Sequence, residues 1–249
     1  MTKVLGYWEK DEYYKVSEEA SRNKTHPAVV AINEFAKNAK KILDMGCGDG
    51  TRLASLETQG EKLGVDVSDF AIQRGEKKYR NLKLIRGDVA NLPFKDKSFD
   101  FVYSMFVIEH VESPEKVLKE AFRILAKGGT LILAAPNYGA PNRRSPNSRE
   151  GRLSKLFKRV RGVGRNSLNW TKVTPPEGEY FIDVDTLVEP YIVSLLKYLK
   201  NLGFKIVKAS SLWETDEFSL KQLPFKILGR LGINSFVWWG PQIFIIAKK

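Results

Sequence analysis

Short β-rich runs alternate with helical patterns along most of this 249-residue chain. That alternation is typical of a doubly wound α/β fold, in which a largely parallel sheet carries helices on both faces. Hydrophobic residues make up 43% of the chain, enough for a substantial core. The sequence therefore predicts one α/β domain with strands at 40–46, 62–68, 82–88, 99–105, 129–136, 203–210 and 241–249.

Helical patterns separate these runs, and two of them begin with proline. Pro27 stands in the first turn of one pattern and Pro114 in the first turn of another. Proline suits that position because its missing N–H would have no helical partner there. The glycine pair 128–129 is predicted to close the helix that begins near Pro114. The expected helices span 27–38, 50–59, 68–79, 113–126 and 187–201.

Composition limits the chemistry and the location of the chain. Cys47 is the single cysteine, which excludes internal disulfides and cysteine-cluster metal sites. The chain has no apolar run of about 18 residues, and its polar start lacks the apolar stretch of a signal peptide. We therefore expect a cytoplasmic protein without a membrane-spanning segment.

The stretch KILDMGCGDG joins an apolar run to three glycines at alternate positions, Gly46, Gly48 and Gly50. Glycine lets the backbone turn tightly and lets a ligand approach where a Cβ atom would collide. A dinucleotide-binding turn needs G-x-G-x-x-G, and Thr51 occupies the third of those positions here. Asp44, two residues before the first glycine, suits a ligand with a cationic group better than a pyrophosphate.

Two further acids stand at predicted strand ends. Asp66 lies 20 residues after Gly46, where a carboxylate typically accepts both hydroxyls of a ribose. Asp88 ends the third predicted strand, where it can accept an exocyclic amine, and Val89 offers apolar surface to a flat base. A ligand with an amino-acid-like cation, a ribose and a purine matches these features, and S-adenosylmethionine has all three parts.

At these residues the sequence resembles the class I S-adenosylmethionine-dependent methyltransferases, with a methyltransferase type 11-like domain. The resemblance covers roughly residues 26–136 and again the last two predicted strands. It implies a seven-strand Rossmann-like sheet of order 3-2-1-4-5-7-6 with the last strand antiparallel. The matching stretches are ILDMGCGDG, LGVDVS, GDVANLPFKDKSFDFVYSMFVIEHV and RILAKGGTLILAAP.

The resemblance also assigns roles in cofactor binding. It implies that the glycine turn backs the methionine part of S-adenosylmethionine, and that the next two strand-end acids bind ribose and adenine. The residues that close the fourth strand match the family's contact on the methionine side. The implied cofactor-binding residues are Asp44, Gly46, Cys47, Gly48, Gly50, Asp66, Val67, Asp88, Val89, Ser104 and Met105.

Two segments without clean periodicity, 137–180 and 211–240, extend this core. Connections that long are usually functional or disordered, and both leave from the rim that holds the cofactor. Tyr7, Trp8, Tyr13 and Tyr14 give the N-terminal segment an aromatic face that can cover the ligand. The predicted organisation is a lid at 1–26, an S-adenosylmethionine-binding core at 27–136, a basic rim insert at 137–180, and the rest of the sheet at 181–249 with a second rim insert at 211–240.

Glu109 and His110 are the candidate catalytic residues, because FVIEHV places titratable groups after the fourth strand. Methyl transfer needs a base only if the acceptor must lose a proton. His110 is therefore interpreted either as that base or as a hydrogen-bonded structural histidine. Some quinone-pathway O-methyltransferases carry an acid three residues before the Glu-His pair, forming a metal site. Phe106 stands there in this sequence, so we expect no metal.

Two other side chains invite a catalytic reading. Cys47 is interpreted as a small turn residue, because a catalytic thiol needs a base beside it. His26 precedes Pro27 at a helix start and is interpreted as a cap or lid residue.

The net charge of +12 is concentrated in one part of the chain. Ten lysines and arginines but one acid lie within 143–172, which leaves +3 for the remaining residues. If helical, 151–165 is basic and amphipathic, and 218–240 combines basic residues with two tryptophans, Trp238 and Trp239. Both patterns are consistent with peripheral contact at an anionic membrane surface.

The acceptor stays open at this stage. A small or amphipathic metabolite is favoured, and a membrane lipid or lipid-linked glycan is an alternative. RNA is less favoured, because ten cations in 30 residues can neutralise phosphates but no RNA-binding motif is present. Protein acceptors and a non-catalytic S-adenosylmethionine-binding protein are further alternatives. The reaction predicted is methyl transfer from S-adenosylmethionine, leaving S-adenosylhomocysteine.

Overall fold

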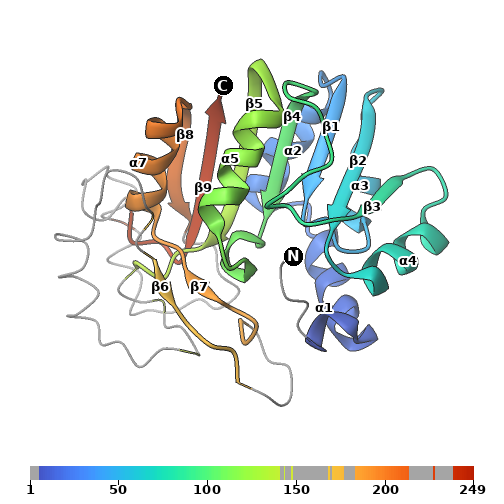
Figure 1. Cartoon of the computed structure of the whole chain (residues 1–249), viewed down its shortest axis with the longest axis horizontal. Helices are drawn as coiled ribbons and strands as arrows, with labels where there is room; N and C mark the ends of the chain where they lie inside the picture. The colour runs from blue at the N-terminus through green and yellow to red at the C-terminus, as the bar shows by residue number, and fades with distance from the viewer. Residues whose placement is uncertain are drawn as a thin grey trace.

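The structure is a computed structural model of the whole chain. It describes residues 6–140, 143, 147, 168, 170–176, 183–212, 227 and 238–249. Within these residues one sheet of seven strands forms the centre of the molecule (Figure 1). In spatial order its strands are β3 (Lys83–Arg86), β2 (Glu61–Asp66), β1 (Lys41–Met45), β4 (Phe99–Met105), β5 (Leu125–Pro136), β9 (Gln242–Lys248) and β8 (Lys205–Leu212).

The strand order confirms the one that the resemblance implied. Counting only the strands of this sheet, it reads 3-2-1-4-5-7-6. The first five strands pair in parallel, with Asp44 beside Gly64 and Tyr103. The last strand, β9, runs antiparallel to both of its neighbours, pairing Ile132 with Ile246 on one side and Ala247 with Ile206 on the other.

Helices cover both faces of the sheet. Figure 1 draws α5 and α7 in front of it and α2 behind it. Each face has its own apolar cluster, so the two layers of helix bury two cores. The bounds are α2 (Pro27–Ala36), α3 (Thr51–Ala54), α4 (Asp69–Lys78), α5 (Pro114–Ile124) and α7 (Ile192–Leu202).

Strand β5 has a continuous apolar sequence because both of its faces are buried. Leu131 and Leu133 enter the cluster under α5 and α7, whereas Ile132 and Ala134 enter the cluster under α2. A strand in which both faces are buried needs apolar residues at every position. This explains why the central strands could be recognised without a clean apolar–polar alternation.

Three predicted boundaries differ most from the structure. Helix α3 ends at Ala54, and β5 begins at Leu125, so the glycine pair 128–129 lies within the strand's bounds. Helix α7 begins at Ile192 because Val188–Glu189 (β7) pairs with Thr171–Lys172 (β6) instead. The proline that follows β7 disfavours helical backbone in the residue before it, which keeps β7 extended.

The additions to the sheet gather at one edge. A single-turn helix η1 (Gly6–Glu9) and helix α1 (Asp11–Arg22) lie at the carboxyl ends of the parallel strands, on the same side as β6 and β7 (Figure 1). Ligands of doubly wound sheets bind at that edge. Among the described residues no helix has the length and apolar character needed to cross a bilayer.

Candidate active site

A cavity of about 470 Å³ lies at the carboxyl ends of the parallel strands. Its volume falls in the range of small-molecule sites. The cavity collects residues from the N-terminal segment, the glycine turn, the ends of β2 and β4, the loop after β3, and the turn at 183–185 that precedes β7. Eleven of the predicted site residues line it: Asp44, Gly46, Cys47, Gly48, Asp66, Val67, Asp88, Val89, Met105, Glu109 and His110.

The glycine turn combines a ligand-facing and a scaffold position. Apart from its chain neighbours, the heavy atom nearest to a Cβ atom on Gly48 would be Tyr14 Cε1, 3.8 Å away, so this position opens onto the cavity. A Cβ atom on Gly50 would lie 3.1 to 3.3 Å from Leu84 and Leu82 of the β3 layer. Gly50 therefore packs against the scaffold and is absent from the cavity lining, unlike its two predecessors.

Asp66 ties the end of β2 to the glycine turn. Its Oδ2 accepts the Gly48 N–H at 2.8 Å, and its Oδ1 accepts the Ser68 N–H at 2.9 Å. Burial raises the pKa of this carboxyl group, while the backbone hydrogen bonds act in the opposite direction. Each carboxylate oxygen can accept a further hydrogen bond, so the group can also receive ribose hydroxyls from the cavity.

Asp88 and Val89 occupy the loop after β3. Asp88 Oδ1 accepts the Ala90 N–H at 2.9 Å, which holds the loop in a turn, and Asp88 also lines the cavity. Val89 is 6% exposed and belongs to the apolar cluster under α5. The loop thus offers the cavity a carboxylate beside an apolar wall, as the sequence predicted.

Asp44 has a cationic neighbour that sequence reasoning missed. Burial raises the pKa of Asp44 to about 7, against the opposing effects of Tyr103 and Arg52. Arg52 lines the cavity, and its Nη1 is buried without a hydrogen-bond partner among the described residues. A carboxylate and a guanidinium side by side match the amine and the carboxylate of an amino acid. The sequence signal that could have identified Arg52 was its place two residues after Gly50.

The end of β4 places one of its two predicted residues in the cavity. Met105 lines the cavity, whereas Ser104 is buried and donates a hydrogen bond to the Met45 carbonyl at 2.8 Å. Ser104 therefore links β4 to β1 and is absent from the lining. Phe106 follows at φ +56°, a rare conformation for a bulky residue, and lines the cavity.

Glu109 and His110 belong to a short helix, η2 (Ile108–His110), at the far end of the cavity. His110 Nδ1 lies 3.0 Å from the Asp185 carbonyl oxygen and 3.6 Å from its carboxylate. Burial alone would lower the pKa of His110, but Asp185 and Glu109 outweigh it and the pKa rises. Burial raises the pKa of Glu109 to about 7.

Asp183, Asp185 and Arg143 also line this end and were not predicted. Arg143 forms an ion pair with Asp183, and the indole N–H of Trp8 donates to Asp185 Oδ2 at 2.9 Å. These residues lie 40 to 177 positions from their partners, and no local motif marks them. Only the fold brings them to η2.

The lid residues cover the cavity. Trp8, Tyr13 and Tyr14 line it, whereas Tyr7 donates a hydrogen bond to the Pro176 carbonyl at 2.6 Å. Tyr14 also stacks on Phe70 of α4, with ring centroids 5.6 Å apart. Three of the four aromatic side chains named from the N-terminal segment thus belong to the wall of the cavity.

His26 caps helix α2. Its Nδ1 accepts the Ala28 N–H at 3.2 Å, so the proton of the neutral ring is on Nε2, which lies 2.7 Å from Gln242 Oε1. The side chain of Gln242 lines the cavity. The predicted basic amphipathic stretch, 151–165, lies outside the described residues, as does 218–240 apart from residues 227 and 238–240.

Comparison with known proteins identifies the core. Residues 43–133 match the methyltransferase domain family. Demethylmenaquinone methyltransferase of Staphylococcus saprophyticus is 36% identical over 103 residues, 39% of this chain and 44% of that protein. Sterol 24-C-methyltransferase of Pneumocystis carinii is 34% identical over 112 residues, 42% of this chain and 30% of that protein. The chain thus spans less than half the length of these relatives.

A solved structure agrees over nearly the whole chain. The S-adenosylmethionine-dependent methyltransferase from Archaeoglobus fulgidus has a TM-score of 0.56 at 20% identity, covering 95% of this chain and all of that one (100%). At this identity the likeness concerns the fold. Residues 43–133 thus match the methyltransferase domain family, and the sheet built around them has the Rossmann-like methyltransferase fold.

Proposed function

We propose that this protein transfers a methyl group from S-adenosylmethionine to a small-molecule acceptor. The observation that carries the proposal is the convergence of Asp44, Asp66 and Asp88 on one cavity, around a glycine turn open at Gly48. These groups come from three different strand ends. They match the amine, the ribose and the adenine of the cofactor.

The residues around the cavity fit the cofactor chemically. Arg52 adds a buried, unpartnered donor beside Asp44, which suits the carboxylate of the methionine part. When bound, the cofactor supplies an activated methyl group on a sulfonium. The protein's contribution is to exclude water with the lid and to hold the acceptor in line, and orientation of this kind can provide much of the rate.

Glu109 and His110 are the proposed proton-handling residues. Both line the cavity. Burial raises the pKa of Glu109 to about 7, and the carboxylates of Asp185 and Glu109 raise the pKa of His110. A group that titrates near the working pH is suited to accept a proton from an acceptor. His110→Ala should slow transfer while leaving cofactor affinity unchanged, and unchanged kinetics would assign His110 a structural role.

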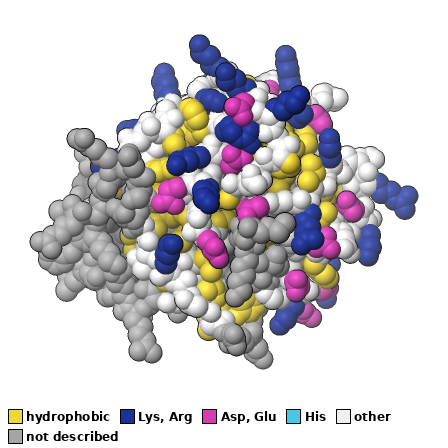
Figure 2. Space-filling model, viewed as in Figure 1, with side chains coloured by type: hydrophobic (Ala, Val, Ile, Leu, Met, Phe, Trp, Pro, Cys, Tyr) yellow, Lys and Arg dark blue, Asp and Glu magenta, His cyan; other side chains and the backbone are white. Residues whose placement is uncertain are grey.

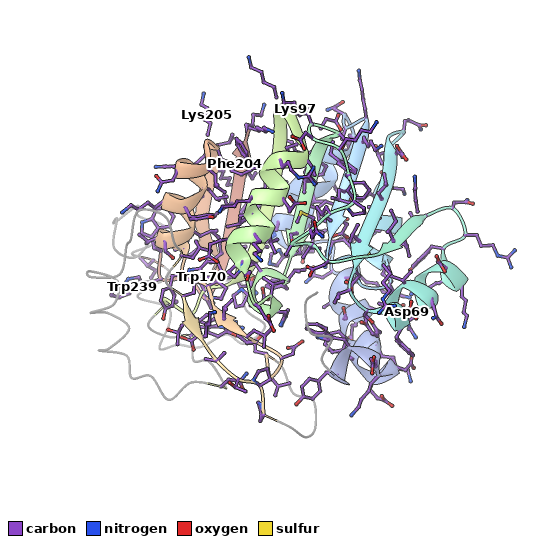
Figure 3. The ribbon with its side chains drawn as sticks, viewed as in Figure 1. Asp69, Lys97, Trp170, Phe204, Lys205 and Trp239 are labelled. Atoms are coloured by element: carbon purple, nitrogen blue, oxygen red, sulfur yellow. The ribbon has the colours of Figure 1, made fainter. Side chains whose placement is uncertain are left out.

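The cofactor site is tested by calorimetric titration with S-adenosylhomocysteine. Asp66→Ala removes charge-assisted hydrogen bonds, so its affinity should fall by roughly 10- to 100-fold. Asp69→Ala removes the same carboxylate from an exposed position on α4, away from the cavity lining (Figure 3), and should bind normally. Near-normal affinity of the Asp66 variant would contradict the assignment.

Turnover is tested separately by incubating the protein with labelled S-adenosylmethionine and a low-mass cell extract. Label in a new compound supports a methyltransferase. Tight cofactor binding without any transfer would favour a non-catalytic binding protein. Transfer to RNA or to lipid in parallel incubations would move the acceptor to those classes. Relatives named for menaquinone and sterol methylation favour a small or amphipathic acceptor, including a lipid-linked one.

A further inference from the structure

Three carboxylates surround the end of the cavity that the cofactor assignment leaves free. Glu109 and Asp185 are each 2% exposed, and Asp183 lies beside them. The neighbouring cations are His110, whose ring nitrogens lie 3.6 to 3.7 Å from two of the carboxylates, and Arg143, which pairs with Asp183. The cluster therefore has three acidic groups and at most two positive charges.

One fully buried oxygen of this cluster has no hydrogen-bond partner among the described residues. Asp185 accepts the Trp8 indole N–H, and Asp183 accepts a guanidinium N–H from Arg143. Glu109 Oε2 is buried with no partner among the described residues, and its Oε1 lies 3.7 Å from His110, beyond hydrogen-bond distance. Burying a carboxylate oxygen without a hydrogen-bond donor costs free energy. A ligand that supplies a donor to this oxygen would therefore form a strong interaction.

The charge of the cavity lining limits which kind of ligand can supply that hydrogen-bond donor. The described lining residues include two arginines, one histidine and no lysine. An anionic head group would meet repulsion in such a cavity, although the protein as a whole carries +12. The carboxylates of the lining are Asp44, Asp49, Asp66, Asp88, Glu109, Asp183 and Asp185.

Cofactor binding does not use up this negative charge. Asp49 is already paired with Arg74 and Lys78 of α4. The cofactor assignment uses the strand-end acids and brings one net positive charge with its sulfonium, amine and carboxylate. The cluster around Glu109 remains, at the end of the cavity formed by η2 and the segment 183–185.

We infer that the acceptor is a small amine, whose protonated nitrogen binds between Glu109 and Asp185 and then receives the methyl group. The inference rests on the proposed function and names its substrate class. An ammonium group supplies the donor that Glu109 Oε2 lacks and the positive charge that the cluster lacks. A neutral hydroxyl would supply the donor alone.

The reaction balances with the groups named. One N–H bond breaks as the ammonium proton moves to the Glu109 carboxylate. The freed nitrogen lone pair forms the new N–C bond to the methyl carbon, while the bonding pair of the broken C–S bond stays on sulfur. The products are the methylated ammonium and neutral-sulfur S-adenosylhomocysteine. Glu109 then releases its proton to solvent.

The first test separates acceptors by charge. A low-mass extract of the source organism is divided by ion exchange into cationic, neutral and anionic pools, and each is incubated with the protein and labelled S-adenosylmethionine. We expect label in the cationic pool, on a nitrogen atom. Label confined to the neutral or anionic pool, or on oxygen or carbon, overturns the amine inference but retains a methyltransferase. No label in any pool contradicts both.

The second test uses the acceptor isolated from the cationic pool. Its binding to protein loaded with S-adenosylhomocysteine is measured by calorimetry, so the readout does not depend on turnover. Glu109→Gln should weaken binding roughly 10-fold or more and should leave S-adenosylhomocysteine affinity and the melting temperature near wild type. Glu109→Asp, which keeps the charge on a shorter side chain, should recover part of the affinity.

The matched control is Glu112→Gln, which removes the same charge from an exposed residue outside the cavity. This variant should bind the amine as the wild type does. Equal weakening in both glutamine variants, or normal binding in the Glu109 variant, would overturn the assignment.

Discussion

The position of a residue in the motif does not by itself decide whether its side chain faces the cavity. Arg52 contributes to the surroundings of Asp44, whereas Gly50 and Ser104 face the scaffold instead of the cavity. Residues that are close in sequence can therefore differ in role, because one lines the cavity and another packs against the scaffold. The direction of each side chain depends on the turn and on the packing around it.

Arg52 is predicted to recognise the amino-acid part of the cofactor. Arg52→Met keeps the volume but removes the guanidinium, so affinity for S-adenosylhomocysteine should fall roughly 10-fold. Affinity for 5′-methylthioadenosine, which lacks the amino-acid part, should not change. Calorimetric titration with both compounds distinguishes this role from a general loss of structure, which would weaken both.

Asp44 is predicted to make stability depend on pH. Its pKa is about 7 in the folded protein against an ordinary 3.8, so the folded state holds an extra proton between these values. Stability of the unliganded protein should therefore fall as pH rises from about 4 to about 7. Asp44→Asn removes this contribution and should gain stability relative to wild type between pH 5 and pH 8 in urea denaturation. A constant difference would contradict the shift.

The elements of the lid are held to the core by a charged contact between α1 and α4. Arg74 of α4 pairs with Asp11, Glu18 and Asp49, the last belonging to the glycine turn. Lys78 adds a pair with Glu18 at 2.7 Å. The same contact therefore joins α1, helix α4 of the core and the glycine turn.

Arg74→Met is predicted to loosen this contact. Because Arg74 is 25% exposed, the loss of stability should be modest, about 1 kcal/mol. Dissociation of S-adenosylhomocysteine, measured by stopped flow, should become severalfold faster because the roof over the cavity opens more often. Lys15→Met is the control, since Lys15 is 69% exposed and pairs with Asp11 alone. Equal effects of both variants would contradict a specific clamp.

Charge is divided across the whole molecule. The cavity is acidic, whereas lysines and arginines project from the opposite edge of the sheet, where Lys97 and Lys205 lie far from Trp170 (Figures 2 and 3). The excess of basic residues falls within 143–172, largely outside the described residues. The net charge of the chain, +12, and the excess of carboxylates in the cavity lining therefore have opposite signs.

The basic residues predict binding of the protein to anionic vesicles. In co-sedimentation we expect binding to anionic but not to neutral lipid, because the net charge is +12. If the apolar residues of 151–165 and 218–240 also insert, binding should persist at moderate salt. Binding lost at moderate salt would indicate charge alone, and no binding at low salt would contradict a membrane contact.

Local pattern was sufficient for the sheet and for the three acids that line the cavity at its strand ends. The strand order was implied by a family resemblance carried by contiguous stretches. Asp44, Asp66 and Asp88 were found because each lies at or near the carboxyl end of a strand. Parallel strands deliver their carboxyl ends to one edge whatever lies between them. For this reason the sequence alone predicted that these acids lie close together.

The end of the cavity around η2 could not be predicted in this way. Glu109 meets Asp183 and Asp185 across more than 70 residues of chain, where the Leu187 N–H donates to the Glu109 carbonyl oxygen at 2.8 Å, and no periodicity predicted this contact. The unpartnered oxygen of Glu109 is likewise a property of packing. Charge complementarity between distant segments exists only once the backbone has brought them into contact, so the folded structure alone revealed this cluster.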